Sequence, residues 1–303
     1  MPAKVILNPY SNRWNSQHRW PEAEAELKAA GVSFDLAISD RKGGIVELAE
    51  QAARDGYSPV IAAGGDGTIG EVVNGLARAA GGHTKVLGPV GILPLGSAND
   101  LANNIGIPSE LKTAAEVIAS GVTDLIDLCK CNDRYFANNS AAGIEPYVTT
   151  KNEGIHFIKG ISRYLLAAVL AILDKPEWQG DVEWEGGGYR GPLSFVSIGN
   201  GRRTGGLFFM TPHADPWDGY LTFAYGYRKT RLGMFLALPR AMKPGKGNYI
   251  EMNGMNELNC SWLSIKLDKP SPAHTDGELF PEWIKEFRYD IFPKKLQVLA
   301  PRK

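Results

Sequence analysis

Cysteine is scarce in this sequence of 303 residues, which has only Cys129, Cys131 and Cys260. Three cysteines cannot all be paired within one chain, and a lone Cys-x-Cys lacks the spacing of a zinc site. The sequence therefore excludes a fold that depends on a framework of disulfides. Reduced thiols in a cytosolic protein are the simplest expectation.

Net charge and long apolar runs are missing as well. The formal net charge is +0 and the sequence pI is near 7.0, so no global field attracts nucleic acid, and we expect no nucleic-acid partner. The longest apolar run, Tyr164 to Leu173, is too short to span a bilayer. A strand that starts near Val5 leaves no room for a signal peptide. We therefore expect a cytoplasmic protein whose membrane contact, if any, is peripheral; a monomer and a homodimer both stay open.

Two common nucleotide-binding patterns are absent or incomplete. No G-x-x-x-x-G-K-[ST] segment occurs, so a P-loop nucleotidase is not supported. Gly65 to Gly70 fits the dinucleotide pattern G-x-G-x-x-G, which expects an acidic residue about 20 positions later. No Asp or Glu lies between Val72 and Asn99. A nicotinamide-dependent dehydrogenase therefore loses its second requirement.

One stretch nevertheless predicts an anion site. Apolar residues from Val60 to Ala63 favour a buried strand, Gly64 to Thr68 form a glycine-rich turn, and the spacing from Ile69 to Leu76 favours a helix. Glycines leave backbone N–H groups open to a ligand, and a helix start adds partial positive charge. A phosphate is the expected guest. A tight connection without any ligand is the alternative.

The first part of the chain alternates strands with helices. Strands are expected at 4–7, 33–38, 60–63 and 85–95, and helices at 22–30, 44–55, from 69, from 97 and at 113–120. This alternation predicts an α/β domain with a parallel sheet and helices on both faces. Ligands bind at the carboxyl ends of such strands, where Asn8, Ser39, the glycine turn and Ser97 fall.

After Leu125 the pattern changes to short β-branched and aromatic segments separated by turns. We predict a nucleotide-binding domain at 1–126 and a mostly antiparallel β-sandwich domain at 127–291. One helix, Ile155 to Leu173, should interrupt the second domain before Lys175 and Pro176. The closing segment 292–303 should return to the first domain as a strand.

Two long motifs carry a family resemblance. Gly64 to Thr68 reads Gly-Gly-Asp-Gly-Thr, and Leu93 to Ala102 reads Leu-Pro-Leu-Gly-Ser-Ala-Asn-Asp-Leu-Ala. Together they resemble the diacylglycerol kinase catalytic-domain family, with its bacterial diacylglycerol kinases and sphingosine kinase-like lipid kinases. The resemblance covers nearly the whole chain. It implies a Rossmann-like first domain, similar to that of NAD kinases and phosphofructokinases, and a second domain that holds the lipid substrate.

The activity implied by the resemblance is phosphoryl transfer from ATP, with Mg²⁺, to the free hydroxyl of a membrane lipid. Diacylglycerol, giving phosphatidate, is the first expectation, and sphingoid bases, ceramide and phosphatidylglycerol stay open. An NAD kinase shares the glycine turn, and a nucleotide-binding regulator without turnover is a further alternative. Asn12 and Gly70, where the family usually has Gly and Asn, are departures that favour the regulator.

The resemblance also assigns site residues. The lipid hydroxyl would meet Glu278 as general base, with Asp276 close to the metal, whereas a plain Asp-Gly hairpin is the alternative. Asp66, between two glycines, is a candidate Mg²⁺ ligand and catalytic residue, or else caps the next helix. The predicted nucleotide-binding residues are Asn8, Ser11, Ser39, Gly64, Gly65, Asp66, Gly67, Thr68, Glu71 and Ser97.

Two further predictions concern the second domain. The resemblance implies a structural Mg²⁺ site at Asp218, with Asp215 and Tyr220 as backbone or water-mediated ligands, although a hairpin at Asp218-Gly219 also fits. The stretch from Gly219 to Ile250 holds six basic residues and no acidic one. It should dock on anionic lipid at the membrane surface, unless it is merely a solvated basic face.

Overall fold

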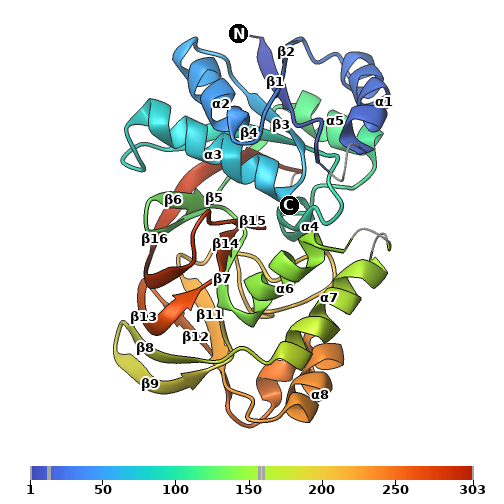
Figure 1. Ribbon diagram of the computed structural model, residues 1–303. Coiled ribbons are helices and arrows are strands. Elements are labelled where there is room, and N and C mark those ends of the chain that lie inside the picture. The colour runs from blue at the N-terminus through green and yellow to red at the C-terminus, as the bar shows by residue number, and fades with distance from the viewer. Residues whose placement is uncertain (1, 12–14, 156–157, 159–160, 302–303) are drawn as a thin grey trace.

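The computed structural model describes residues 2–11, 15–155, 158 and 161–301. Asn12, the last two residues of the predicted segment 292–303, and residues 156, 157, 159 and 160 of the predicted helix from Ile155 to Leu173 lie outside the described residues. Two domains are stacked along the long axis of the molecule (Figure 1). The first holds a parallel sheet and the second holds mostly antiparallel sheets. The expected α/β class with a second, antiparallel domain is confirmed.

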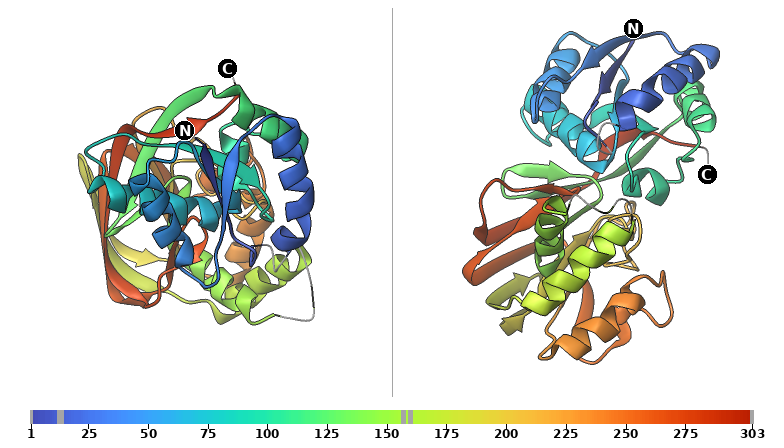
Figure 2. Two further views of the ribbon diagram at one scale, coloured as in Figure 1. Left: turned by 90° about the horizontal axis from the view of Figure 1, so that it is seen from above. Right: turned by 45° about the vertical axis from the view of Figure 1, so that its right-hand side comes forward.

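The first domain is built on four parallel strands in the order β2-β1-β3-β4. They are β1 (Ala3–Leu7), β2 (Phe34–Ile38), β3 (Val60–Gly64) and β4 (Leu87–Pro94). Helices α1 (Asn15–Ala29) and α5 (Leu111–Ser120) pack together on one side of the sheet, and α2 (Gly44–Arg54) and α3 (Asp66–Ala80) on the other (Figures 1 and 2). Every residue of β3 is buried, as its apolar run predicts.

Helix α1 begins seven residues earlier than predicted and contains Pro21. The proline deprives the carbonyl of Gln17 of its helical partner. Gln17 is exposed, so water can take over that hydrogen bond, while Trp20, Ala23 and Leu27 stay buried on one face. Burial of this face outweighs the local preference of proline.

In the second domain two sheets enclose one core. One sheet has the order β12-β11-β10-β7-β14-β15; the other includes β13, β8 and β9. Their bounds are β5 (Thr123–Cys131), β6 (Arg134–Phe136), β7 (Asn139–Gly143), β8 (Trp178–Trp184), β9 (Gly187–Leu193), β10 (Phe195–Gly199), β11 (Leu221–Gly226), β12 (Met255–Cys260), β13 (Trp262–Ser271), β14 (Ala273–Thr275), β15 (Glu278–Leu279) and β16 (Ile284–Leu299). Phe136, Phe223 and Tyr289 fill the space between the sheets, together with the three free, buried cysteines.

Strand β16 joins the two domains. Its first half pairs antiparallel with β13, the part from Tyr289 to Leu299 pairs antiparallel with β5, and Leu296 and Val298 pair parallel with β4. The parallel sheet therefore continues into a 10-stranded mixed sheet. Strand β5 likewise continues through position 126, where the sequence predicted a domain limit. The domains are thus connected by hydrogen-bonded strands as well as by the chain.

The second domain also carries more helix than the sequence predicted. A single helix from Ile155 to Leu173 was expected; the structure instead has α6 (Ile144–Glu153), α7 (Ile161–Asp174) and α8 (Arg231–Ala241). Helix α8 buries Met234 but exposes Leu232 and Leu236, so no clean helical period is readable in its sequence. Within the described ranges, no helix is long and apolar enough to cross a membrane.

Candidate active site

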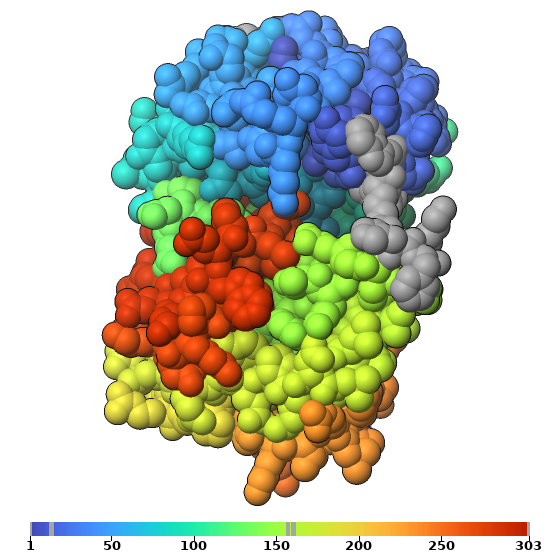
Figure 3. Space-filling view, viewed as in Figure 1, coloured from blue at the N-terminus to red at the C-terminus, as the bar shows by residue number. Residues whose placement is uncertain are grey.

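A polar cleft of about 600 Å³ lies where the two domains meet. The first domain contributes the turn from Gly65 to Gly67 and Ser97, and the second contributes Asp276 to Glu278. This volume is typical of sites for small-molecule ligands. Figure 3 shows the blue and cyan first domain meeting the green and red segments of the second along this boundary.

Most of the predicted nucleotide-binding residues line this cleft. Those that do are Asn8, Ser11, Gly65, Asp66, Gly67, Glu71 and Ser97. Gly64, Thr68 and Ser39 are not part of its lining. The loops that follow β1, β3 and β4 thus converge at the carboxyl edge of the parallel sheet, as the fold requires.

The three residues outside the lining shape the loops around it. The buried Thr68 hydroxyl lies 3.1 Å from both Asn8 Nδ2 and Ser11 Oγ, so it ties the loop after β1 to the glycine turn. A Cβ at Gly64 would overlap the side chain of Thr68. Ser39 donates its hydroxyl hydrogen to the carbonyl of Arg41 at 2.8 Å, and Arg41 lines the cleft.

Asp66 is the first residue of α3 and is partly buried. Its Oδ1 accepts a hydrogen bond from the backbone N–H of Leu101 at 2.9 Å. The carboxylate therefore does cap a helix, but that helix is α4 (Asp100–Asn104) and not α3. Burial raises the pKa of Asp66 above its ordinary value, and the backbone hydrogen bond from Leu101 opposes this effect. Asp66 also faces the cleft, so capping leaves a role there open.

Asp100 is a charged residue of the cleft that the sequence reasoning missed. Its side chain is 4% exposed and lies 3.3 Å from Arg203 Nε, and both of its oxygens accept the N–H of Gly206. Burial, followed by the nearby charge of Asp66, raises the pKa of Asp100 to about 7. Asp100 belongs to the motif Leu93 to Ala102, which was the available signal. Its meeting with Arg203 depends on the tertiary structure.

Asp276 and Glu278 lie on the β14–β15 hairpin. Asp276 has a φ of 47° and is buried, and its carboxylate accepts the N–H groups of Ala137, Asn138 and Asn139 at 2.9, 2.9 and 3.0 Å. Burial raises the pKa of Asp276 to about 6 against the opposing effect of these bonds. The Asp-Gly hairpin that the sequence offered as an alternative is therefore present. Asp276 also fixes the loop before β7 at the edge of the cleft.

Two glycines of α3 allow the hairpin to approach the helix closely. A Cβ at Gly67 would lie 2.6 Å from Glu278 Oε1, and one at Gly70 would lie 3.1 Å from Asp276 Oδ2. Gly70, where the family usually has Asn, therefore leaves room for the side chain of Asp276. Burial and the adjacent charge of Glu278 raise the pKa of Glu71 to about 7. Asp66 and Glu278, distant in sequence, line one cleft.

The predicted structural metal site lies apart from the cleft, in the loop before β11. Asp218 Oδ1 accepts the N–H of Tyr220 at 2.8 Å, and Asp215 Oδ1 accepts that of Trp217 at 3.1 Å. Asp127, which was not predicted as a site residue, lies on β5 and accepts at 2.6 Å the N–H of Gly219, on the same loop as Asp218. Burial, with the charges of Asp215 and Asp127 as lesser causes, raises the pKa of Asp218.

No three His, Cys, Asp or Glu side chains form a metal-binding group among the described residues. The assignment of Mg²⁺ to Asp218 therefore stays a prediction. The hairpin alternative has direct support, because Asp218 and Asp215 each accept a backbone N–H two residues further along the chain.

Comparison with known proteins agrees with this arrangement. The family description "Diacylglycerol kinase catalytic domain" matches residues 2–131, and "YegS C-terminal NAD kinase beta sandwich-like domain" matches residues 138–300. This chain belongs to the diacylglycerol kinase catalytic-domain family. The two matched regions meet in the interval that separates β5 from β7, on either side of the cleft.

Relatives in this family carry lipid kinase names. A Chromohalobacter salexigens protein named "Probable lipid kinase YegS-like" is 30% identical over 92% of this chain and 88% of its own length. A Staphylococcus aureus protein named "Diacylglycerol kinase" is 30% identical over 73% of this chain and 69% of its own length. The chain is therefore a member of a family of kinases that includes lipid kinases.

A solved structure shares the fold. The crystal structure of a diacylglycerol kinase from Bacillus anthracis superposes with a TM-score of 0.77 over 99% of this chain and 97% of that one. The two sequences are 20% identical. At this identity the likeness shows the common two-domain architecture.

Proposed function

We propose that this protein transfers the γ-phosphoryl group of ATP, with Mg²⁺, to the free hydroxyl of a membrane lipid, with diacylglycerol as the first expected acceptor. One observation carries the proposal. The polar cleft that holds Asp66 and Glu278 adjoins an apolar cavity in the second domain, because Tyr164 and Thr204 line both. A hydroxyl on an apolar body can therefore reach the carboxylates while its chain stays out of water.

The lining of the cleft fits a magnesium-bound triphosphate. A Cβ at Gly65 would lie 3.1 Å from the Cα of Gly96, so the two loops approach as closely as bare backbone permits. Arg41 and Lys42 add positive charge. Asp66 offers the oxygen ligand that Mg²⁺ prefers alongside phosphates. When bound, ATP supplies the phosphoryl group and Mg²⁺ neutralises its charge.

Glu278 is our candidate for the base that takes the proton of the acceptor hydroxyl. It faces the cleft from the second domain, next to Gly67 of the nucleotide turn. Removing that proton turns the hydroxyl oxygen into a better nucleophile as the phosphoryl group is transferred. Asp276, whose oxygens hold three backbone N–H groups, acts by fixing the hairpin that carries Glu278.

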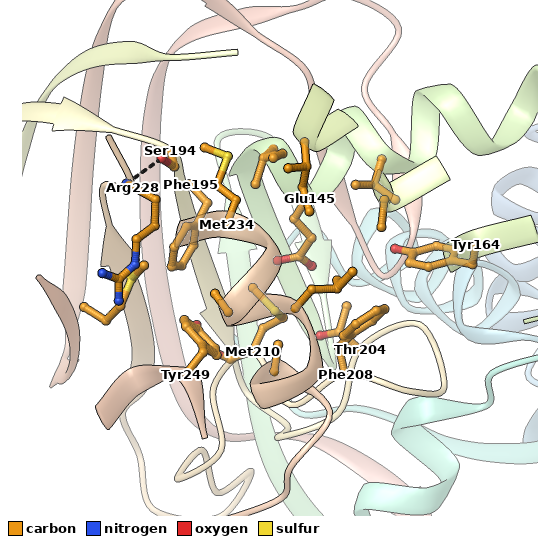
Figure 4. A pocket seen from close by; sticks show the side chains of 18 residues that line it. Glu145, Tyr164, Ser194, Phe195, Thr204, Phe208, Met210, Arg228, Met234 and Tyr249 are labelled. Atoms are coloured by element: carbon orange, nitrogen blue, oxygen red, sulfur yellow. Dashed lines mark hydrogen bonds between the residues drawn. The ribbon is translucent and has the colours of Figure 1, made fainter. Parts of the chain in front are cut away.

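The apolar cavity is suited to part of a lipid chain. It has a volume of about 120 Å³ and lies between helices α6, α7 and α8 and the six-stranded sheet. Figure 4 shows Phe195, Met234 and Phe208 around it, with Tyr164 and Thr204 at one end and Arg228 at the other. The apolar lining offers a chain the same environment as a protein core.

The end of the second domain that carries α8 is suited to a membrane surface. Leu232 and Leu236, one helical turn apart, are 68% and 56% exposed. The predicted basic stretch surrounds them, with residues such as Lys229 and Arg231 exposed. Exposed apolar side chains within a basic surface favour peripheral contact with anionic lipid.

A transfer assay tests the proposal. Purified protein is incubated with γ-labelled ATP, Mg²⁺, and either NAD or mixed micelles of diacylglycerol, monoacylglycerol, phosphatidylglycerol, ceramide or a sphingoid base. We expect label in a lipid. Label in NAD alone would instead identify an NAD kinase, and nucleotide binding without transfer to any acceptor would identify a regulator. Either of these results would overturn the proposal.

A further inference from the structure

His274 has one ring nitrogen held in place and one without a partner. Its side chain is 3% exposed, and Nε2 lies 3.2 Å from Glu145 Oε1. The hydroxyl of the buried Ser197 donates to the other oxygen of Glu145. Among the residues that the structure describes, His274 Nδ1 has no hydrogen-bond partner. A buried polar atom without a partner is unfavourable, so this one calls for an explanation.

The pair stands at the wall between the apolar cavity and the polar cleft. Glu145 lines the cavity, and its carboxylate points into it in Figure 4. His274 lines the cleft. Tyr164 and Thr204 line both spaces, so the cavity and the cleft adjoin there. A lipid with its apolar chain in the cavity and its polar end in the cleft would therefore bring that end close to the imidazole of His274.

The contact with Glu145 sets what His274 can offer. A carboxylate only accepts hydrogen bonds, so Nε2 carries the hydrogen and donates it. In the neutral ring Nδ1 then has a bare lone pair and acts as an acceptor. The missing partner must therefore be a hydrogen-bond donor, such as a hydroxyl or an amine, and a carbonyl or ether oxygen cannot take its place.

His274 and Glu278 would contact different atoms of the bound lipid. In the hairpin, Thr275 pairs with Glu278 and His274 pairs with Leu279. Side chains of paired residues share a face of a sheet and successive residues alternate, so His274 and Glu278 leave the hairpin on opposite faces. Glu278 lies against Gly67 of the nucleotide turn, whereas His274 is turned towards α6 and the apolar cavity.

Resting on the proposed function, we propose that the acceptor lipid carries a second hydrogen-bond donor beside the hydroxyl that is phosphorylated, and that His274 Nδ1 accepts from it. Lipids with a free glycerol end, monoacylglycerols and sphingoid bases have such a donor. Diacylglycerol, whose single hydroxyl is the reacting group, lacks it, so within the proposed lipid kinase function this inference replaces diacylglycerol as the first expected acceptor. His274 is thus a residue that determines specificity, with Glu145 and Ser197 as positioning residues.

The test compares two acceptor lipids, 1-oleylglycerol and its 2-O-methyl ether, in which a methyl group replaces the hydrogen of the second hydroxyl. For the unaltered protein we expect kcat/KM to be about tenfold or more higher for the free diol, since losing a buried partner costs about 1 to 3 kcal/mol. In His274→Gln the amide N–H can still reach Glu145 but no acceptor replaces Nδ1. This variant should lose the preference, with the change mainly in KM for the diol and little change for the ether.

Two variants control the comparison. His274→Asn places an amide oxygen near the former Nδ1 and should keep part of the preference for the diol. If the role of His274 were purely structural, His274→Asn and His274→Gln should both lose that preference. His18→Gln, at an exposed position on α1, should behave as the unaltered protein. Melting temperatures of all variants identify loss of folding. Equal kcat/KM for the two acceptors, or an equal loss for both in His274→Gln, would overturn the inference.

A binding measurement separates this inference from the proposed function. Equilibrium dialysis of the two labelled lipids in detergent micelles reports recognition without turnover. Preferential binding of the diol that disappears in His274→Gln, without any phosphoryl transfer, would support the inference and refute the kinase proposal. Transfer to both acceptors at equal rates, with equal binding, would support the kinase proposal and overturn the inference about His274.

Discussion

The carboxylate of Glu278 lies against the backbone of Gly67, so closely that a Cβ at Gly67 would be 2.6 Å from Oε1. The two residues are 211 positions apart, and they bring the hairpin of the second domain onto the glycine turn of the first. Real Cβ atoms do not approach an oxygen this closely, so the absence of a side chain at Gly67 is a condition for the position of Glu278.

Gly67→Ala should therefore displace Glu278 and lower kcat by about 10- to 100-fold, because misplacing a catalytic group by about 1 Å costs on this order. Glu278→Asp in the same chain shortens the side chain and should restore part of the loss. Gly245→Ala is the matched control, since a Cβ there meets nothing within 4 Å. Unchanged steady-state kinetics in Gly67→Ala would show that the contact does not matter for turnover.

Glu278→Gln and Asp66→Asn should each lower kcat by roughly 100-fold or more while the protein stays folded, because proton removal or charge neutralisation is lost. The measurement is transfer of labelled phosphate to the acceptor, with circular dichroism as a check on folding. Glu282→Gln changes an exposed carboxylate near the same hairpin and should leave kcat unchanged. A loss below about threefold in Glu278→Gln would remove Glu278 from the role of base.

Asp100 should make stability depend on pH in the ligand-free protein. Its pKa is raised from 3.8 to about 7 in the folded state, so its contribution is complete below about pH 4 and is lost as pH rises towards 7. Asp100→Asn removes this titration. The free energy of unfolding of the variant, relative to the unaltered protein, should therefore rise between pH 5 and pH 8, by on the order of 2 kcal/mol. Urea unfolding at the two pH values measures it, and a difference that stays constant would contradict the prediction.

Asp218→Ala should lower the melting temperature and abolish its increase on addition of Mg²⁺. The side chain holds the N–H of Tyr220, and Asp127 and Asp215 lie close enough to raise its pKa through their charges, so a cation would relieve their repulsion. Thermal unfolding with and without Mg²⁺ is the measurement. Asp268→Ala, at an exposed position on β13, is the control. A Mg²⁺-dependent rise that survives in Asp218→Ala would place the responsible ion elsewhere.

Leu232→Ser combined with Leu236→Ser should weaken sedimentation with vesicles that contain phosphatidylglycerol, because the exposed apolar pair on α8 no longer enters the interface. Activity towards a short-chain acceptor in solution should persist. The paired substitution Leu36→Ser with Leu258→Ser changes two exposed leucines on other elements and serves as the control. Equal binding of the unaltered protein to neutral and anionic vesicles would refute the electrostatic part of the proposal.

Local patterns in the sequence identified the elements that carry the glycine turn. The apolar run into Gly64 and the spacing from Ile69 to Leu76 predicted β3 and α3, although the helix starts at Asp66. Helix α8 escaped prediction because its exposed Leu232 and Leu236 interrupt the periodic burial that marks a helix. Where apolar residues face solvent for another reason, hydrophobic periodicity no longer reports secondary structure.

The sequence alone determined the class of fold and the family, because glycine turns and strand–helix alternation are local properties of the chain. Only the tertiary structure decided that Glu278 meets Gly67, that Asp100 meets Arg203, and that His274 keeps a free nitrogen beside the cleft. These contacts join residues more than 100 positions apart, and they depend on how β16 draws the second domain against the first. Such distances are set by packing, which no local pattern encodes.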